Sequence, residues 1–96
     1  MLIGQVVGTV VSTRKDEKLE GLKFLIVKVL DLDGKLSGAY VVGMDSVGAG
    51  TGEVVMYATG SSARQTGATK DRPVDAVIMA IVDAIDVGGV TRFLKK

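Results

Sequence analysis

The sequence predicts a mainly β fold, a small barrel or rolled sheet with a helix late in the chain. Short β-branched runs alternate with turn-forming residues over the first two thirds of the chain, and only the segment that starts at Pro73 has helical spacing. The chain has 96 residues and is 47% hydrophobic, so one thin core leaves an excess of apolar surface. We therefore expect a single domain over residues 1–96 that self-associates.

Four strands are predicted before the helix, each a β-branched run that ends at turn-forming residues. They cover residues 2–13, 22–30, 39–47 and 53–59. In the first strand, Gly4 and Gly8 share one face, which suits tight curvature or a close backbone approach. A charged loop, residues 14–21, and an Asp-Gly turn, residues 31–34, connect the first three strands. Residues 89–96 are expected to form an extended or frayed C-terminal tail.

The segment from Pro73 to Gly88 fits two structures. Pro73 and Asp75 are typical of the first turn of a helix, and the apolar residues that follow have helical spacing. A strand period of two residues also fits this part of the chain, through Ile81, Asp83, Ile85 and Val87. Periodicity alone leaves open whether the helix reaches Gly88 or ends near Met79 and gives way to a fifth strand.

Composition excludes several classes of function. Twelve basic and eleven acidic residues give a net charge of +1, so charge does not favour nucleic acid or a membrane surface as a partner. The absence of cysteine and histidine removes thiolate metal sites, thiol nucleophiles and the commonest general base. The first residues lack the pattern of a signal peptide, and the apolar runs are too short to span a membrane. These features predict a soluble cytoplasmic protein without metal or cofactor.

The glycine-rich run GAGTG, residues 48–52, could be a phosphate-binding loop. Its glycines are two residues apart, whereas dinucleotide and P-loop motifs require other spacings and a helix directly after the loop. The residues that follow, EVVMYAT, are β-rich. The run is therefore predicted to be a tight turn whose glycines permit positive φ or close backbone approach.

Other candidate catalytic groups lack partners. Ser61 and Ser62 in GSSAR have no histidine to activate them, and Arg64 stands where a nucleophile elbow would have glycine. Asp83 and Asp86 have no partner at the spacing of an acid–base pair.

The sequence gives little support for a calcium site or a nucleic-acid-binding site. The Asp-Gly turn at residues 31–34 lacks the other ligands of a calcium loop. A small barrel also raises the alternative of an OB-like nucleic-acid-binding module, but its aromatic residues are not interleaved with basic ones. These aromatic residues are Phe24, Tyr40, Tyr57 and Phe93.

Five segments together resemble the pentameric vertex proteins of bacterial microcompartments, the family of the carboxysome and ethanolamine-utilisation vertex proteins. In chain order they are GQVVGTVVST (residues 4–13), EGLKFLIVKV (20–29), DSVGAGTGEVV (45–55), GSSAR (60–64) and PVDAVIMAIVD (73–83). The resemblance implies a five-stranded OB-like barrel with a short helix at residues 73–79, followed by a strand at 81–87. Ala80 departs from the glycine that many members have there, and the tail VTRFLKK is assigned no function.

The resemblance further implies a cyclic homopentamer that closes the five-fold vertices of a polyhedral shell and contacts hexameric shell tiles. Such a protein would be structural rather than enzymatic, would lie in the shell within the cytoplasm, and would need no cofactor. The candidate pore or subunit-interface residues are Gly48, Ala49, Gly50, Thr51, Gly52, Glu53, Gly60, Ser61, Ser62, Ala63 and Arg64. Which loop lines the central opening, and whether the opening passes metabolites, is left open.

Overall fold

The computed structural model describes residues 1–13 and 15–95, so Arg14 of the predicted charged loop and Lys96 of the tail lie outside the described residues. The described residues form seven strands and two short 3-10 helices. The strands are β1 (Leu2–Val10), β2 (Phe24–Leu30), β3 (Leu36–Asp45), β4 (Val54–Thr59), β5 (Ala76–Ile81), β6 (Ala84–Val87) and β7 (Val90–Leu94). The 3-10 helices are η1 (Glu17–Leu19) and η2 (Gly60–Arg64).

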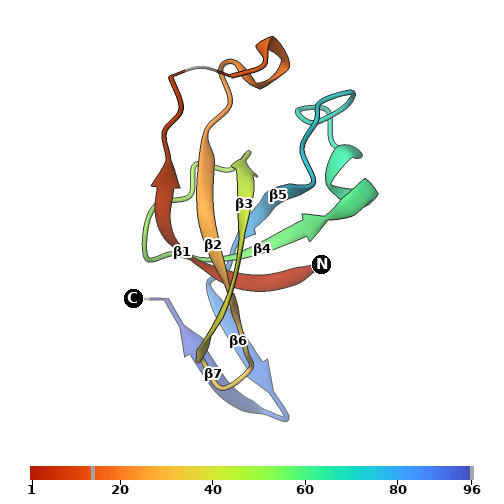
Figure 1. Ribbon diagram of the computed structural model, residues 1–96. Helices are drawn as coiled ribbons and strands as arrows, with labels where there is room; N and C mark the ends of the chain where they lie inside the picture. Colours follow the sequence, from red (N-terminus) through yellow and green to blue (C-terminus); the bar gives the residue numbers. More distant parts are fainter. Residues whose placement is uncertain (14, 96) are drawn as a thin grey trace.

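Five strands close into a barrel in the order β1-β2-β3-β5-β4, which confirms the predicted five-stranded OB-like barrel (Figure 1). All neighbours are antiparallel except β3 and β5, which are parallel and pair only through Met44 with Val77 and Asp45 with Ile78. The strands β6 and β7 form a separate antiparallel hairpin that projects from one end of the barrel (Figure 1).

The barrel is filled by side chains from β1, β2, β4, β5 and one loop, and the partly buried Val41 of β3 packs against them. The buried cluster consists of Val6, Leu25, Val27, Ala49, Val55, Tyr57 and Ile78. Gly4 is buried against this cluster, and a Cβ at Gly4 would lie 2.5 Å from Val27 Cγ1 and 2.6 Å from the Lys28 carbonyl oxygen. The predicted close approach is therefore confirmed at Gly4. At Gly8 the nearest atom would be Ile26 Cδ1 at 3.7 Å, which is ordinary contact.

A second apolar cluster lies on the outer face of the barrel. Val77 and Ile78 are consecutive in β5 and so point to opposite faces. Ile78 packs inside the barrel, whereas Val77 packs with Ala63 of η2 and with Val74, which precedes β5. This burial on both faces fixes the position of η2 against the barrel wall.

The predicted helix at residues 73–79 is wrong. Those residues contain a bend at Pro73 and the start of β5 at Ala76. The reason is the two-sided burial of β5, in which Val77 and Ile78 are both buried. Together with the buried Val74 before the strand, they have the apolar spacing of a helix face. The helical residues near this part of the chain are those of η2, where a loop was expected.

The predicted strand at residues 81–87 is also wrong as one element. Strand β5 ends at Ile81, the Val82 amide donates to the Val54 carbonyl at 2.8 Å, and β6 begins at Ala84 outside the barrel. Most of the expected frayed tail is β7, which pairs with β6.

The turn at residues 31–34 is confirmed. Gly34 has a φ of 81°, and the Asp31 carboxylate accepts hydrogen bonds of 2.9 Å from the backbone nitrogens of Asp33 and Lys35. Asp31 therefore serves the turn itself, as an Asx residue does. The strand after the turn begins at Leu36, three residues before the expected start at Ala39.

Candidate functional site

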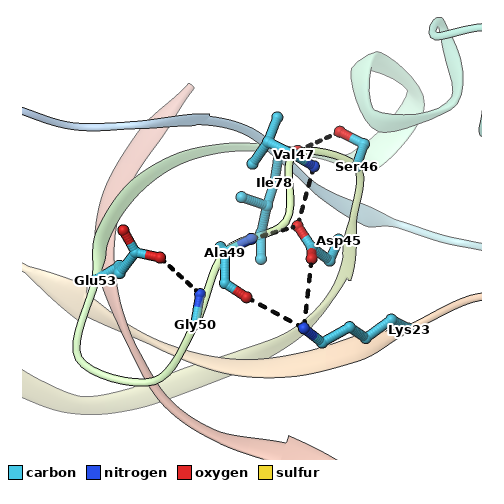
Figure 2. A network of polar contacts seen from close by, with 8 residues as sticks. All are labelled: Lys23, Asp45, Ser46, Val47, Ala49, Gly50, Glu53 and Ile78. Carbon is cyan, nitrogen blue, oxygen red and sulfur yellow. Dashed lines mark hydrogen bonds and ion pairs between the residues drawn. The ribbon is translucent and has the colours of Figure 1, made fainter.

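The glycine-rich loop between β3 and β4 is organised from its first residue by a carboxylate. Asp45 Oδ1 accepts hydrogen bonds from the backbone nitrogen of Val47 at 3.1 Å and from that of Ala49 at 3.2 Å (Figure 2). The next residue, Ser46, donates its hydroxyl to the Ile78 carbonyl of β5 at 2.6 Å. The first half of the loop is thus bound both to itself and to the barrel wall.

Lys23 joins this network from the residue before β2. Its ammonium lies 3.8 Å from Asp45 Oδ2 and donates to the Ala49 carbonyl at 3.3 Å (Figure 2). The Asp45 side chain is 4% exposed and the Lys23 side chain 58% exposed. The lysine therefore neutralises a nearly buried carboxylate while its own charge stays hydrated, which limits the cost of burying the aspartate.

A second carboxylate organises the end of the loop. Glu53 Oε1 accepts a hydrogen bond of 2.8 Å from the Gly50 nitrogen, and Glu53 Oε2 lies 2.9 Å from the ammonium of Lys95. The hydrogen bond from Lys95 is the main reason that the pKa of Glu53 is lowered, and the same contact raises the pKa of Lys95. Because Lys95 directly follows β7, this pair ties the C-terminal hairpin to the loop.

The glycines have separate roles in the loop. Gly48 and Gly52 have φ angles of 74° and 93°, which favour glycine, as predicted for a tight turn. Between them, Ala49 is buried and its side chain belongs to the barrel core. The Gly52 nitrogen donates to the Val6 carbonyl of β1 at 2.7 Å. The run therefore places the small side chain of Ala49 inside the barrel and then leads the backbone back to the barrel wall at β1.

In this geometry most backbone amides of the loop are already bound to protein oxygens, so few could bind a phosphate. The nitrogens of Val47, Ala49, Gly50, Gly52 and Glu53 all donate to protein oxygens within 3.2 Å. A phosphate loop instead points free amides at its ligand and continues into a helix, whereas β4 follows here. The loop therefore has a structural role, in which it connects β3 to β4 and packs against the barrel.

The second predicted segment, GSSAR, forms η2. Gly60 has a φ of 64° and its nitrogen donates to the Asp75 carbonyl at 2.8 Å. Arg64 Nη1 donates to the Val74 carbonyl at 3.1 Å, and Ala63 is fully buried. Ser61 and Ser62 are exposed. The arginine thus fastens η2 to the segment that enters β5.

The structure places the two predicted segments at opposite ends of β4 (Figure 1). A six-residue strand separates them, which corresponds to about 20 Å. Within one subunit they therefore do not form a common site.

No catalytic or metal-binding constellation is seen in the described part of the chain. Residues 1–13 and 15–95 contain no group of three acidic side chains that could hold a metal ion. The Tyr57 hydroxyl is buried in the core without a hydrogen-bond partner among the described residues, and burial raises the pKa of Tyr57. Its position inside the packed barrel is that of a core residue.

Exposed apolar side chains gather on particular elements. Leu36, Tyr40 and Val42 are exposed on β3, and Val10 and Val11 at the end of β1. Tyr40 is 62% exposed, which is large for an aromatic residue of a small protein. Such surfaces are typical of a chain that is buried further by assembly. No helix in the described residues has the length and apolar composition to cross a bilayer.

Sequence reasoning missed several members of the loop network, among them Lys23, Asp45 and Lys95. Asp45 precedes the glycines as Asp-Ser-Val-Gly, and an aspartate at the start of a turn is a signal for side-chain capping. Lys95 is 42 residues from Glu53, and no local pattern connects the two.

Comparison with known proteins gives a consistent result. Residues 1–83 match the family model described as ethanolamine utilisation protein EutN/carboxysome. The chain is 43% identical over its full length, and over 96% of the relative's length, to the carboxysome shell vertex protein CcmL of Gloeobacter violaceus. It is 40% identical to the bacterial microcompartment shell vertex protein EutN of Salmonella typhimurium, over 99% of this chain and 96% of that protein.

A solved structure adds an oligomeric state for a relative. The GrpN pentameric microcompartment shell protein from Rhodospirillum rubrum superposes with a TM-score of 0.83 at 44% identity. The match covers 91% of this chain and 99% of that one.

Proposed function

This chain belongs to the ethanolamine utilisation protein EutN/carboxysome family, and we propose that it is a shell vertex protein that assembles as a homopentamer. In this role the pentamer closes the five-fold vertices of a bacterial microcompartment shell. The match to relatives named as shell vertex proteins, over nearly the whole of both chains, carries the proposal. The pentameric GrpN structure supports the ring.

The geometry of the subunit suits this role. A cyclic ring uses a heterologous contact, in which one surface of a subunit meets a different surface of the next. Hydrogen bonds to Asp45 and Glu53 fix the glycine-rich loop, and apolar side chains are exposed on more than one element. Burial of exposed apolar surface between subunits stabilises the contacts of a ring.

The chain is a structural component rather than an enzyme, because the relatives carry structural names and its glycine-rich loop is bound to itself. Its place in the cell is the microcompartment shell. The alternatives of a nucleic-acid-binding OB-like module and a nucleotide-binding enzyme are not favoured by the relatives.

The partners of the pentamer are proposed to be hexameric shell tiles. Co-expression with a hexameric shell protein, followed by electron microscopy, tests this. The expected result is closed polyhedral shells when this chain is present and elongated or open assemblies when it is absent. Shells that close equally well without the chain, or that exclude it, would contradict the proposal.

The glycine-rich loop and η2 remain proposed sites of subunit contact or of the central opening. Because they lie at opposite ends of β4, at most one of them lines a given face of the opening. A tryptophan at Thr51, an exposed loop residue, should alter flux through the encapsulated pathway in intact shells if the loop lines a conducting pore. Unchanged flux would assign the loop to another surface.

A further inference from the structure

Strand β3 has an open edge over most of its length. On one side it pairs with β2 at Leu36 and, after a bulge or irregularity of the ladder, from Tyr40 to Met44. On the other side, within the described residues, its ladder partner is β5, which reaches only Met44 and Asp45. The backbone groups of residues 36–43 that point away from β2 therefore have no neighbouring strand.

This edge lacks the charges and the proline that often protect one, although the ladder with β2 has a bulge or irregularity between Leu36 and Tyr40. Exposed edge strands commonly carry charges, proline, bulges that turn the edge away, or a covering element. Residues 36–43 read LSGAYVVG and contain no charge and no proline. Three of their apolar side chains are exposed, those of Leu36, Tyr40 and Val42. Such an edge in a soluble protein is expected to be covered by another chain.

We propose that the open edge of β3 is covered by the next copy of this chain in the ring. The inference rests on the proposed homopentamer. Two β3 edges that paired with each other would form a two-fold contact and stop at a dimer. A ring therefore requires that β3 meets a different surface of its neighbour.

The end of β1 supplies that surface. Strand β1 pairs with β4 only from Leu2 to Gln5, so residues 7–10 also have an open side opposite β2. Val11, just beyond, is 90% exposed. The open edge of β3 and the open side of β1 are thus complementary in backbone hydrogen bonding and in apolar character.

An apolar groove lies beside the end of β1. It has a volume of about 400 Å³ and is lined by Val10, Val11, Leu22 and Phe24, with Lys15 and Lys23 among its polar residues. The phenol ring of Tyr40 from the neighbouring copy fits this chemistry, with the ring on the apolar wall and the hydroxyl near a lysine. Tyr40 is thereby the anchor of the contact, as buried aromatic residues often are in interfaces.

Hydrogen exchange at the β3 amides tests the contact directly. In a free subunit, amides that point to β2 exchange slowly and those at the open edge exchange quickly, so protection alternates along residues 40–43, where the register with β2 is regular. In the ring, the proposal predicts slow exchange at consecutive amides. A chain whose native mass is pentameric but whose β3 amides still alternate would overturn the inference and leave the proposed function intact. A chain that is not pentameric would contradict the proposed function instead.

Variants separate the anchor from general surface effects. Tyr40→Ala should raise the concentration at which the pentamer dissociates by about tenfold or more. Leu32→Ala, in the exposed turn before β3, is the matched control and should change it less than about twofold. Val11→Asp, on the opposing surface, should weaken the ring and restore alternating exchange in β3. If Val11→Asp changes neither property while circular dichroism shows a folded subunit, the β1 groove is not the partner surface.

Discussion

The Asp45 carboxylate lies 3.2 Å from the backbone nitrogen of Ala49 and holds that residue where its methyl group enters the barrel core. The same oxygen also accepts the Val47 amide, and Lys23 lies beside the second oxygen. The loop is therefore part of the barrel rather than a flexible connection. Of the two carboxylates that bind amides of the loop, Asp45 is the more deeply buried, with a side chain 4% exposed against 26% for Glu53.

Replacement of that carboxylate should destabilise the subunit. Asp45→Ala removes two charge-assisted hydrogen bonds and leaves two amides without their acceptor, so we expect a loss of about 2–3 kcal/mol in the free energy of unfolding. Urea denaturation of the subunit measures it. Asp86→Ala, at an exposed residue of β6, is the control and should change stability by less than about 0.5 kcal/mol. Equal stability of the two variants would show that the capping bonds contribute nothing.

Gly4 should not tolerate a side chain. The Cβ of Gly4→Ala would lie 2.5 Å from Val27 Cγ1 and 2.6 Å from the Lys28 carbonyl oxygen, so the strands must separate. We expect a loss of about 2–3 kcal/mol, typical of overpacking. Gly8→Ala, four residues along the same strand, meets only ordinary contact and should be neutral or slightly stabilising. Thermal unfolding of both variants decides the point, and similar melting temperatures would contradict the close packing at Gly4.

The Glu53–Lys95 pair should make the melting temperature depend on pH in the acidic range. The pKa of Glu53 in the folded chain is below its unfolded value near 4.5, so its stabilising contribution is fully present above that value. The contribution is lost as the pH falls through the lowered pKa of the folded state. The melting temperature of wild type should therefore exceed that of Glu53→Gln by a constant amount from pH 6 to 7, and the two should converge as the pH falls below about 4.5.

An exposed glutamate provides the control for that experiment. Glu20→Gln should follow the wild-type curve at every pH, because Glu20 forms no ion pair in the described residues. Because the Glu53–Lys95 pair is partly exposed, about 1 M salt should also reduce the difference between wild type and Glu53→Gln. If the difference in melting temperature between wild type and Glu53→Gln stays the same below about pH 4.5, the ionic contact is contradicted.

The proposed contact residues can be tested by one substitution that reverses a charge and one that introduces a large side chain. Arg64→Glu replaces the donor to the Val74 carbonyl with an acid, and Gly50→Trp places a large ring beside Glu53. Both variants should impair ring closure or shell capping while the subunit remains folded. Lys70→Glu and Gly67→Trp, at exposed positions in the loop after η2, are the controls. Pentamers of both test variants that cap shells normally would remove these two residues from the interface.

Local chemistry made much of the fold predictable. The Asp-Gly turn before β3 and the positive φ of Gly48 and Gly52 follow from residue types at short range. The start of β5 was not predictable from periodicity, because a strand that is buried on both faces has no alternation. The apolar residues Val77 and Ile78 therefore gave a helical pattern, and only their contacts with two separate clusters distinguish the strand.

The candidate site was predictable in part. The glycines were correctly predicted to form a turn, since their spacing fits no phosphate motif. The pairing of Lys95 with Glu53 and the separation of the loop from η2 depend on how distant segments meet. Local sequence does not reveal either arrangement, because both depend on which strands pair across long separations in the chain.

Native mass spectrometry of the purified chain tests the central claim most directly. Five copies of the 10.0 kDa chain give a complex of about 50 kDa, and the account predicts that this is the main species at micromolar concentration. A main species at the mass of a monomer, a dimer or a hexamer would contradict the assignment of this chain to the five-fold vertices.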